Sequence, residues 1–405
     1  MTSTLDFRVI STDGHLNPPQ DFVNRLPEHL RPLASKVIEI DGVEYIDIPG
    51  MAPISKSFSE GQMEGPGTDP REAVKEFRND PDGGRVLEKR KAELELDGVW
   101  GEVVFPHSLL SLGAHPNPEY QLAMGRAYND LCAEIFLESE SDRYAPSALV
   151  STLDPLDAVA EARRAKGLGF VCVMLPPVVP WLPYWHKDWE PFWSAVEEMD
   201  LVINFHVFTG NTAQGVDFGN LWVIPQDLVE LGRARFRAER VDERLSTTTM
   251  CMASAMSPLM HLIGSGVLDR HPDLRFALVE SEAGWLPWAL QELDLMQKRR
   301  RFGLVKLELK PSEYFHRQGW ATFIEDQVAI HCLEYIGEDR LMWSNDWPHD
   351  EGCYLESQQV IDRLLGHLPY ATLKKLLHDN AANLYHLDQK EHSDGPARRE
   401  HITVG

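Results

Sequence analysis

Carboxylate and imidazole side chains stand where apolar segments end, near both ends of the chain. The first apolar segment carries Asp13 and His15 at its end, and the segment 341–344 is followed by Asp346 and then Pro348. Side chains alternate between the two faces of a strand, so Asp13 and His15 share a face and can reach one point. Pro348 has no N–H for further ladder pairing. A buried carboxylate is costly unless it meets a cation, so both stretches predict the walls of a metal or catalytic site.

Other candidate residues lie between these stretches or just beyond them. His206 and Glu280 each close an apolar segment, and their side chains are of the types that bind Zn²⁺, Mn²⁺ or Fe²⁺. His349 is a candidate catalytic residue. His107 and Trp181 are candidates for contact with substrate, although a loop histidine without a role and an aromatic ring packed on the fold are the ordinary alternatives.

Eight apolar segments alternate with segments of helical periodicity. The predicted strands are residues 9–15, 99–105, 144–150, 170–175, 201–206, 276–280, 320–323 and 341–344. The predicted helices are residues 84–97, 119–139, 155–166, 189–199, 225–244, 246–269, 284–301, 327–336, 356–366 and 370–379. Eight strands with intervening helices predict a (β/α)₈ barrel of the α/β class, in which the C-terminal strand ends converge on the site.

We expect one barrel domain over residues 1–388 and a flexible tail over 389–405. Within the domain, residues 16–84 predict an insertion between the first strand and the first barrel helix. It contains a hairpin at Asp41-Gly42 between two alternating segments, followed by a stretch rich in Gly, Pro, Asp and Glu. Because the insertion leaves directly from the strand that ends in His15, we expect it over the mouth of the barrel. A disordered spacer is the alternative.

Composition limits the kinds of partner. The 405 residues carry a formal net charge of -24, which repels phosphate backbones and argues against nucleic acid. No run of about 18 apolar residues predicts a membrane span, and no signal peptide is evident at the N-terminus. The five cysteines form no CxxC pair, as is typical of free thiols in a reducing compartment. We expect a cytoplasmic homo-oligomer, or a hetero-oligomer with a paralogue, that acts on a small molecule.

The order of these motifs resembles a known family. Asp13-x-His15, His206, the segment 280–287, the segment 344–349 and the closing segment 379–385 are similar to the amidohydrolase-related branch of the amidohydrolase superfamily. That branch includes aminocarboxymuconate-semialdehyde decarboxylase and the resorcylate-type decarboxylases. The resemblance covers residues 8–387. It implies one divalent metal, expected to be zinc with manganese or iron as alternatives, bound by Asp13, His15, His206 and Asp346.

One position departs from the family pattern. Decarboxylases of this branch carry a catalytic histidine at the end of the sixth strand, where this chain has Glu280. The resemblance therefore favours a hydrolase that acts on a small organic acid or amide through a metal-bound water, with Asp346 as both ligand and proton shuttle. A non-oxidative decarboxylase is the first alternative. Glu280 is also a candidate catalytic residue, which could act as a base or hold a metal-binding histidine. It could instead bind a second metal, as in a dinuclear-iron oxygenase on this fold, and an inactive partner subunit is the last alternative.

Overall fold

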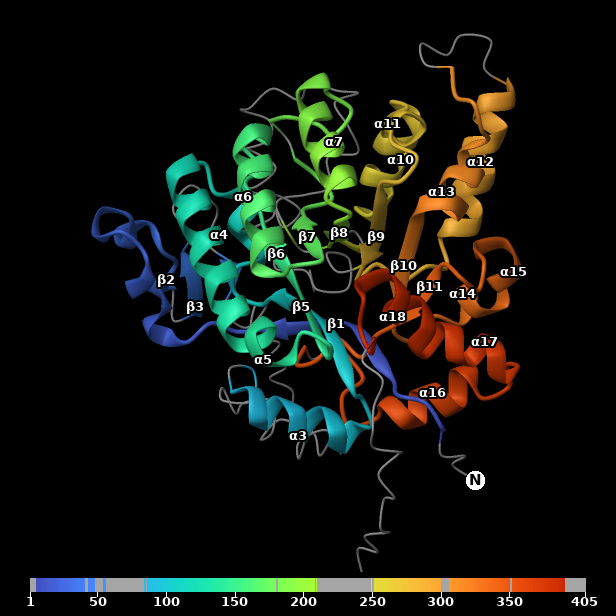
Figure 1. The fold of residues 1–405 in the computed structure, drawn as a ribbon, viewed down its shortest axis with the longest axis horizontal. Helices are drawn as coiled ribbons and strands as arrows, with labels where there is room; N and C mark the ends of the chain where they lie inside the picture. The colour runs from blue at the N-terminus through green and yellow to red at the C-terminus, as the bar shows by residue number, and fades with distance from the viewer. Residues whose placement is uncertain are drawn as a thin grey trace, which may run out of the picture.

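Eight parallel strands form a single sheet whose spatial order follows the chain (Figure 1). The strands are Ile10–Leu16 (β1), Gly101–Pro106 (β5), Tyr144–Leu149 (β6), Cys172–Leu175 (β7), Val202–His206 (β8), Arg275–Val279 (β9), Gly319–Phe323 (β10) and Leu341–Trp343 (β11). A parallel bridge between Gly14 and Trp347 joins the last strand's loop to the first strand, and the His15 N–H donates to the Trp347 carbonyl at 2.7 Å. This nearly closed ring confirms the predicted (β/α)₈ barrel.

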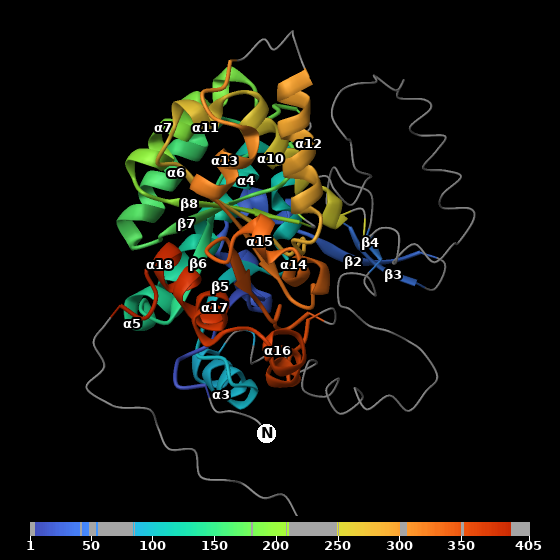
Figure 2. The same ribbon diagram turned by 90° about the vertical axis from the view of Figure 1, so that its right-hand side faces the viewer.

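Helices that follow the strands surround the barrel in the computed structural model (Figures 1 and 2). The structure describes residues 5–40, 43–47, 54–55, 84, 86–179, 181–207, 209, 249, 251–299, 306–349 and 352–389. Among these residues, the α-helices of four or more residues are Leu87–Asp97 (α3), Pro118–Cys132 (α4), Pro155–Leu168 (α6), Glu190–Glu198 (α7), Met256–Gly264 (α10), Val267–Arg270 (α11), Leu286–Arg299 (α12), Pro311–Gln318 (α13), Gln327–His331 (α14), Leu333–Ile336 (α15), Ser357–Leu365 (α16), Tyr370–Lys374 (α17) and Asn380–Tyr385 (α18).

Local sequence sets the boundaries of helices α4 and α6. The Asn117 side chain accepts a hydrogen bond from the backbone N–H of Tyr120 at 2.9 Å, and Asp154 accepts one from Leu156 at 2.8 Å. Each cap is followed by proline at the first helical position, where the missing N–H costs nothing. Helix α6 ends at Gly169, whose φ of 102° is a left-handed conformation that glycine adopts without strain.

Four predicted helices differ from the structure, and the first of them, 119–139, consists of α4, a π-helical turn at Ala133–Leu137 (η4) and the short helix Glu138–Glu140 (α5). Within 246–269 the helix breaks before α11 at Gly266, which has a φ of 73°, and 327–336 is divided between α14 and α15. The helix predicted over 370–379 continues through a π-helical turn, Lys375–Asp379 (η7), into α18. Helix α13 was not predicted, because its eight residues are mostly polar. The helix predicted at 225–244 lies outside the described residues.

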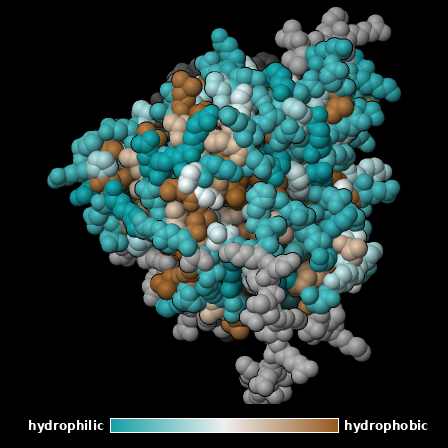
Figure 3. Space-filling model, in the orientation of Figure 1, coloured by the Kyte–Doolittle hydropathy of each residue, from teal (hydrophilic) through white to brown (hydrophobic). Residues whose placement is uncertain are grey.

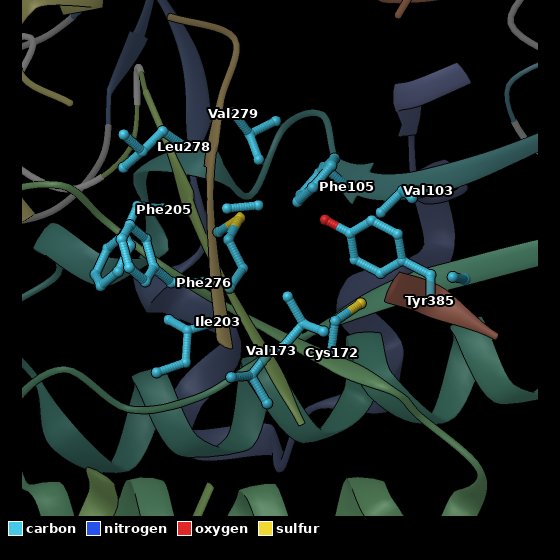
Figure 4. Packing of buried hydrophobic residues seen from close by; sticks show 14 of the residues in the cluster. Val103, Phe105, Cys172, Val173, Ile203, Phe205, Phe276, Leu278, Val279 and Tyr385 are labelled. Atoms are coloured by element: carbon cyan, nitrogen blue, oxygen red, sulfur yellow. The ribbon is translucent and has the colours of Figure 1, made fainter. Parts of the chain in front are cut away.

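Apolar side chains fill the barrel interior (Figure 4), and a short polar chain crosses it. The Tyr385 hydroxyl donates to the Asn204 side-chain oxygen at 2.8 Å, and the Asn204 amide donates to the Ser147 hydroxyl at 3.1 Å. These bonds satisfy polar groups that would otherwise be costly to bury, and they tie α18 to the strands. The face shown in Figure 3 is largely hydrophilic, with apolar residues in small patches.

The predicted hairpin is present in the insertion. Lys36–Ile40 (β2) pairs antiparallel with Val43–Asp47 (β3), which pairs with Ile54–Ser55 (β4), and this small sheet projects from the barrel (Figure 2). Residues 41–42, 48–53 and 56–83 lie outside the described residues, so the placement of 16–84 over the mouth stays a prediction. In the described part of the chain, no helix combines the length and the apolar character that a membrane span needs.

Candidate metal centre

The ends of three strands bring the predicted ligands together inside the barrel. Asp13 and His15 lie on β1, His206 is the last residue of β8, and Asp346 follows β11 in the loop. Each of these four side chains is completely buried, and Glu280, directly after β9, is 5% exposed. Charged groups are rarely buried to this degree without a partner. The barrel therefore brings the predicted site residues together in one place.

The first set of donors consists of Asp13, His15 and His206, whose ligand atoms lie within 4.8 Å of one another. The Nε2 atoms of both imidazoles are 3.4 Å from Oδ1 of Asp13. Two nitrogens and one carboxylate oxygen are a donor set used for Zn²⁺, Mn²⁺ and Fe²⁺.

Backbone carbonyls fix the tautomers of these two imidazoles. Nδ1 of His15 lies 3.1 Å from the carbonyl oxygen of Pro106, and Nδ1 of His206 lies 2.7 Å from that of Val207. A carbonyl can only accept, so both rings carry hydrogen on Nδ1, and in the neutral ring Nε2 presents a lone pair. Lone pairs would then face the carboxylate of Asp13, an arrangement that favours a cation between them.

The second set of donors consists of His15, Glu280, Asp346 and His349, again within 4.8 Å of one another. Nδ1 of His349 is 2.9 Å from Oδ1 of Asp346 and 3.6 Å from Oε1 of Glu280. Asp346 also approaches His15, with 3.1 Å between Oδ1 and Nε2. The four ligands that the sequence predicts are thus divided between two sets that share His15, and their binding to a single ion stays a prediction.

The two substrate candidates lie in different surroundings. His107 adjoins the centre, because its Nδ1 lies 2.8 Å from Nε2 of His349. Burial is the main cause that holds the pKa of His107 well below its usual value. The Trp181 indole N–H instead donates to the Thr152 carbonyl at 2.8 Å, so its ring is anchored just beyond the C-terminal end of β6. A role for either residue in substrate binding stays a prediction.

The three carboxyl groups of the centre differ in the direction in which their pKa is shifted. Burial raises the pKa of Asp13, but the nearby imidazoles, His206 foremost, lower it further, and the result lies below the usual value. Asp346 follows the same pattern with the two imidazoles beside it. Burial and then the charge of Asp346 raise the pKa of Glu280 to about 8. Two of the acids are therefore ready to bind a cation as carboxylates.

Several buried polar atoms of the centre have no hydrogen-bond partner among the residues that the structure describes. They are Oδ2 of Asp13, Nε2 of His15, both side-chain oxygens of Asp346 and Oε2 of Glu280. Leaving such atoms unsatisfied costs about 1–3 kcal/mol each, and more for charged groups. They all belong to the two donor sets, so the residues present fit a divalent metal ion.

The backbone is strained at two of these acids. Glu280 has a φ of 58° and Asp346 a φ of 52°, in the left-handed region that residues other than glycine enter at a cost of about 1–3 kcal/mol. Such strain persists where surrounding structure holds it, and it is common at functional sites. Both turns direct a carboxylate toward the same imidazole, His349.

The loops after β9 and β10 hold each other through two acids that the sequence did not mark as part of the site. Asp326 accepts hydrogen bonds from the backbone N–H groups of Ala283 at 2.8 Å and Gly284 at 2.5 Å. Glu282 accepts in return from the N–H of Ile324 at 3.1 Å. This exchange fixes the loop that begins with the strained Glu280. The signal available in the sequence was Asp326 itself, because an aspartate directly before the helical segment that begins at Gln327 predicts a helix N-cap.

The chain is similar to a family model, to curated proteins and to solved structures. The family model described as amidohydrolase matches residues 95–387. A gamma-resorcylate decarboxylase from Rhodococcus jostii is 25% identical over 360 residues, covering 78% of this chain and 97% of that protein. An amidohydrolase structure from Mycobacterium avium subsp. paratuberculosis has a TM-score of 0.69 at 18% identity, covering 94% of this chain and 98% of its own. A dihydroxybenzoic acid decarboxylase from Polaromonas, solved with bound manganese and the inhibitor 2-nitroresorcinol, has a TM-score of 0.60 at 19% identity and covers 95% and 98%. At these identities the two structures show the fold alone.

Proposed function

Because this chain belongs to the amidohydrolase family, we propose that it is a metal-dependent decarboxylase of a small hydroxylated aromatic acid. From the sequence alone, hydrolysis is the first expectation and decarboxylation the alternative. The relatives named gamma-resorcylate decarboxylase favour the alternative. The main objection to it is the presence of Glu280 where decarboxylases of the branch carry a catalytic histidine.

The single observation that carries the proposal is the position of His349, which answers this objection. His349 comes from the loop after β11, yet its Nδ1 lies 3.6 Å from Oε1 of Glu280 at the end of β9. An imidazole is therefore present beside the position where the family's catalytic histidine is expected. The chain supplies it from a different strand.

Non-oxidative decarboxylation needs one group that gives a proton to carbon. The bond between the ring carbon and the carboxylate breaks, carbon dioxide leaves, and the electron pair that stays on the carbon takes up one proton. Nδ1 of His349 lies 2.9 Å from Oδ1 of Asp346, and a carboxylate at this distance stabilises the protonated imidazole. His107 contacts the other ring nitrogen of His349 and orients it. We assign the proton to Nδ1 of His349.

Asp13, His15 and His206 would hold the metal through the tautomers described above. A divalent ion bound there would polarise an oxygen of the substrate. Zinc is the expectation from the sequence, whereas the Polaromonas relative contains manganese, so manganese is the first ion to test. Burial of the centre excludes bulk water, which would otherwise weaken each electrostatic interaction.

Release of carbon dioxide tests the proposal. The protein, loaded with manganese and separately with zinc, is given gamma-resorcylate and related hydroxybenzoates in heavy water. We expect carbon dioxide and one deuterium at the carbon that lost it. His349→Asn should abolish release while leaving metal content unchanged. Cleavage of a parallel panel of amides and esters, with no release from any acid, would overturn the assignment in favour of hydrolysis.

A two-metal centre is the second candidate, and the second donor set is the observation that favours it. Asp346, Glu280 and His349 offer donors beside the first set, as an oxygenase with two iron ions would require. Elemental analysis of protein purified without added metal separates the candidates. One ion per chain supports the decarboxylase, and two iron ions per chain support the oxygenase.

A further inference from the structure

We infer that Arg90 and Glu102 form a buried pair that positions His15 for metal binding, although neither residue belongs to the two donor sets. Arg90 lies on α3 and Glu102 on β5. Nε of Arg90 donates to Oε2 of Glu102 at 2.7 Å, and Nη1 donates to the backbone carbonyl of His15 at 2.8 Å. The arginine thus holds the main chain of a metal ligand from behind.

The pair also holds the loop that carries Asp346. The guanidinium of Arg90 lies 4.6 Å from the centre of the Trp347 ring, a cation–π distance. The carbonyl of Trp347 in turn accepts from the N–H of His15 at 2.7 Å. Arg90 therefore contacts both segments that provide ligands, β1 and the loop after β11. With Pro106 holding the ring, every polar group of His15 except Nε2 has a partner.

Stability alone is a poor explanation for this pair. Arg90 is 1% exposed and Glu102 is completely buried. Nη2 of Arg90 and Oε1 of Glu102 have no hydrogen-bond partner among the described residues. Burial raises the pKa of Glu102, and Arg90 offsets this only in part. Replacing such a buried ion pair by apolar residues is often neutral or stabilising, so its placement against His15 is the feature that needs explaining.

The backbone of the metal-binding segment is shaped to admit the pair. Gly14 lies between the two ligands Asp13 and His15, and a Cβ atom there would come within 2.4 Å of Oε1 of Glu102 and 3.2 Å of Nη2 of Arg90. The absence of a side chain between the ligands is what lets the charged pair approach the strand. Groups that orient metal ligands in this way change metal affinity about 10–100-fold when removed.

Metal affinity of folded variants tests the inference. In Arg90→Met/Glu102→Leu the charges are replaced by apolar side chains of similar volume, and in Arg90→Lys a charge remains that cannot make both hydrogen bonds. Manganese affinity is measured by competition with a chelator, beside the melting temperature. We expect both variants to bind manganese about 10–100-fold more weakly than the wild type, with the double variant keeping its melting temperature within a few degrees.

A matched control tests whether removing an ion pair far from His15 also weakens metal binding. Arg126→Met removes the ion pair between Nε of Arg126 and the buried Oε2 of Glu161, 3.0 Å apart on the outside of the barrel. Because Glu161 keeps its hydrogen bonds from Asn129 and Arg164, this variant should keep its melting temperature within a few degrees and its manganese affinity unchanged. A folded double variant that binds manganese within twofold of the wild type would overturn the inference, as would a wild type that binds no manganese. The inference rests on metal binding, so hydrolysis in the assay above would overturn the proposed reaction and leave this conclusion intact.

Discussion

Adding one methyl group between the two predicted metal ligands of β1, Asp13 and His15, should damage the centre without replacing either of them. In Gly14→Ala the new Cβ would lie 2.4 Å from Oε1 of Glu102, and ordinary contacts begin at 3.4 Å. The strand and the carboxylate must therefore separate by about 3.4 - 2.4 = 1.0 Å. Glu102 has little freedom to give way, because it is completely buried and its other oxygen is held by Arg90 at 2.7 Å.

Either way of relieving the contact has a measurable consequence. If the carboxylate moves, the buried ion pair with Arg90 lengthens. If β1 moves, Asp13 and His15 move with Gly14. Overpacking of this kind costs about 1–3 kcal/mol of unfolding free energy, and a displacement of about 1 Å at a reacting centre can cost about 100-fold in rate. We expect manganese affinity to fall about tenfold and turnover to fall further.

Denaturant unfolding, chelator competition and turnover of the same preparation measure these effects. Gly264→Ala is the control, because no atom lies within 4 Å of its added Cβ and it ends α10 with an ordinary helical backbone. The control should match or slightly exceed the wild type in stability and keep its manganese affinity. Wild-type affinity in Gly14→Ala would refute the reasoning, since it would show that the space beside Gly14 does not constrain the ligands.

Two further substitutions probe buried acids. Glu280→Gln keeps the shape and removes an acid that can exchange a proton near neutral pH, so turnover should fall far more than metal content or melting temperature; wild-type turnover with normal metal content would make Glu280 a structural residue. Asp97, buried at the end of α3, has its pKa raised to about 6, chiefly by burial. The folded state therefore holds this proton more tightly than the unfolded chain, and the free energy of unfolding should fall by about 3 kcal/mol as pH rises from about 3 to about 7. Asp97→Asn should abolish this fall, and parallel stability curves for the two proteins would contradict the assignment.

The barrel strands could be predicted from the sequence because parallel strands buried on both faces are almost continuously apolar. All eight segments form strands in the predicted order. Because helical segments alternate with these strands, the barrel follows from that order. Helix interruptions were harder to predict. The break at Gly266 depends on its left-handed backbone, whereas Gly264, two residues earlier, is still helical as the last residue of α10. Periodicity alone does not separate these two glycines.

The donor set on β1 and β8 was predictable for a geometric reason. Strand ends of a barrel meet at one face, so Asp13, His15 and His206 had to approach once the strands were correct. The contact between Glu280 and His349 was not predictable in this way. It depends on a turn in which the His349 N–H donates to the Asp346 carbonyl at 2.9 Å and on left-handed backbone at both acids.

The role of Arg90 was hidden for another reason. In the sequence it stands among Lys89, Lys91 and several glutamates, a pattern typical of a solvated helix face. Charge patterns report the average environment of a helix, whereas one turn of α3 points a single arginine into the barrel wall behind β1. A buried cation that close to a cation-binding site would oppose metal binding if it were unpaired. Glu102 neutralises it, so the pair can fix the main chain of His15 while adding little net charge to the centre.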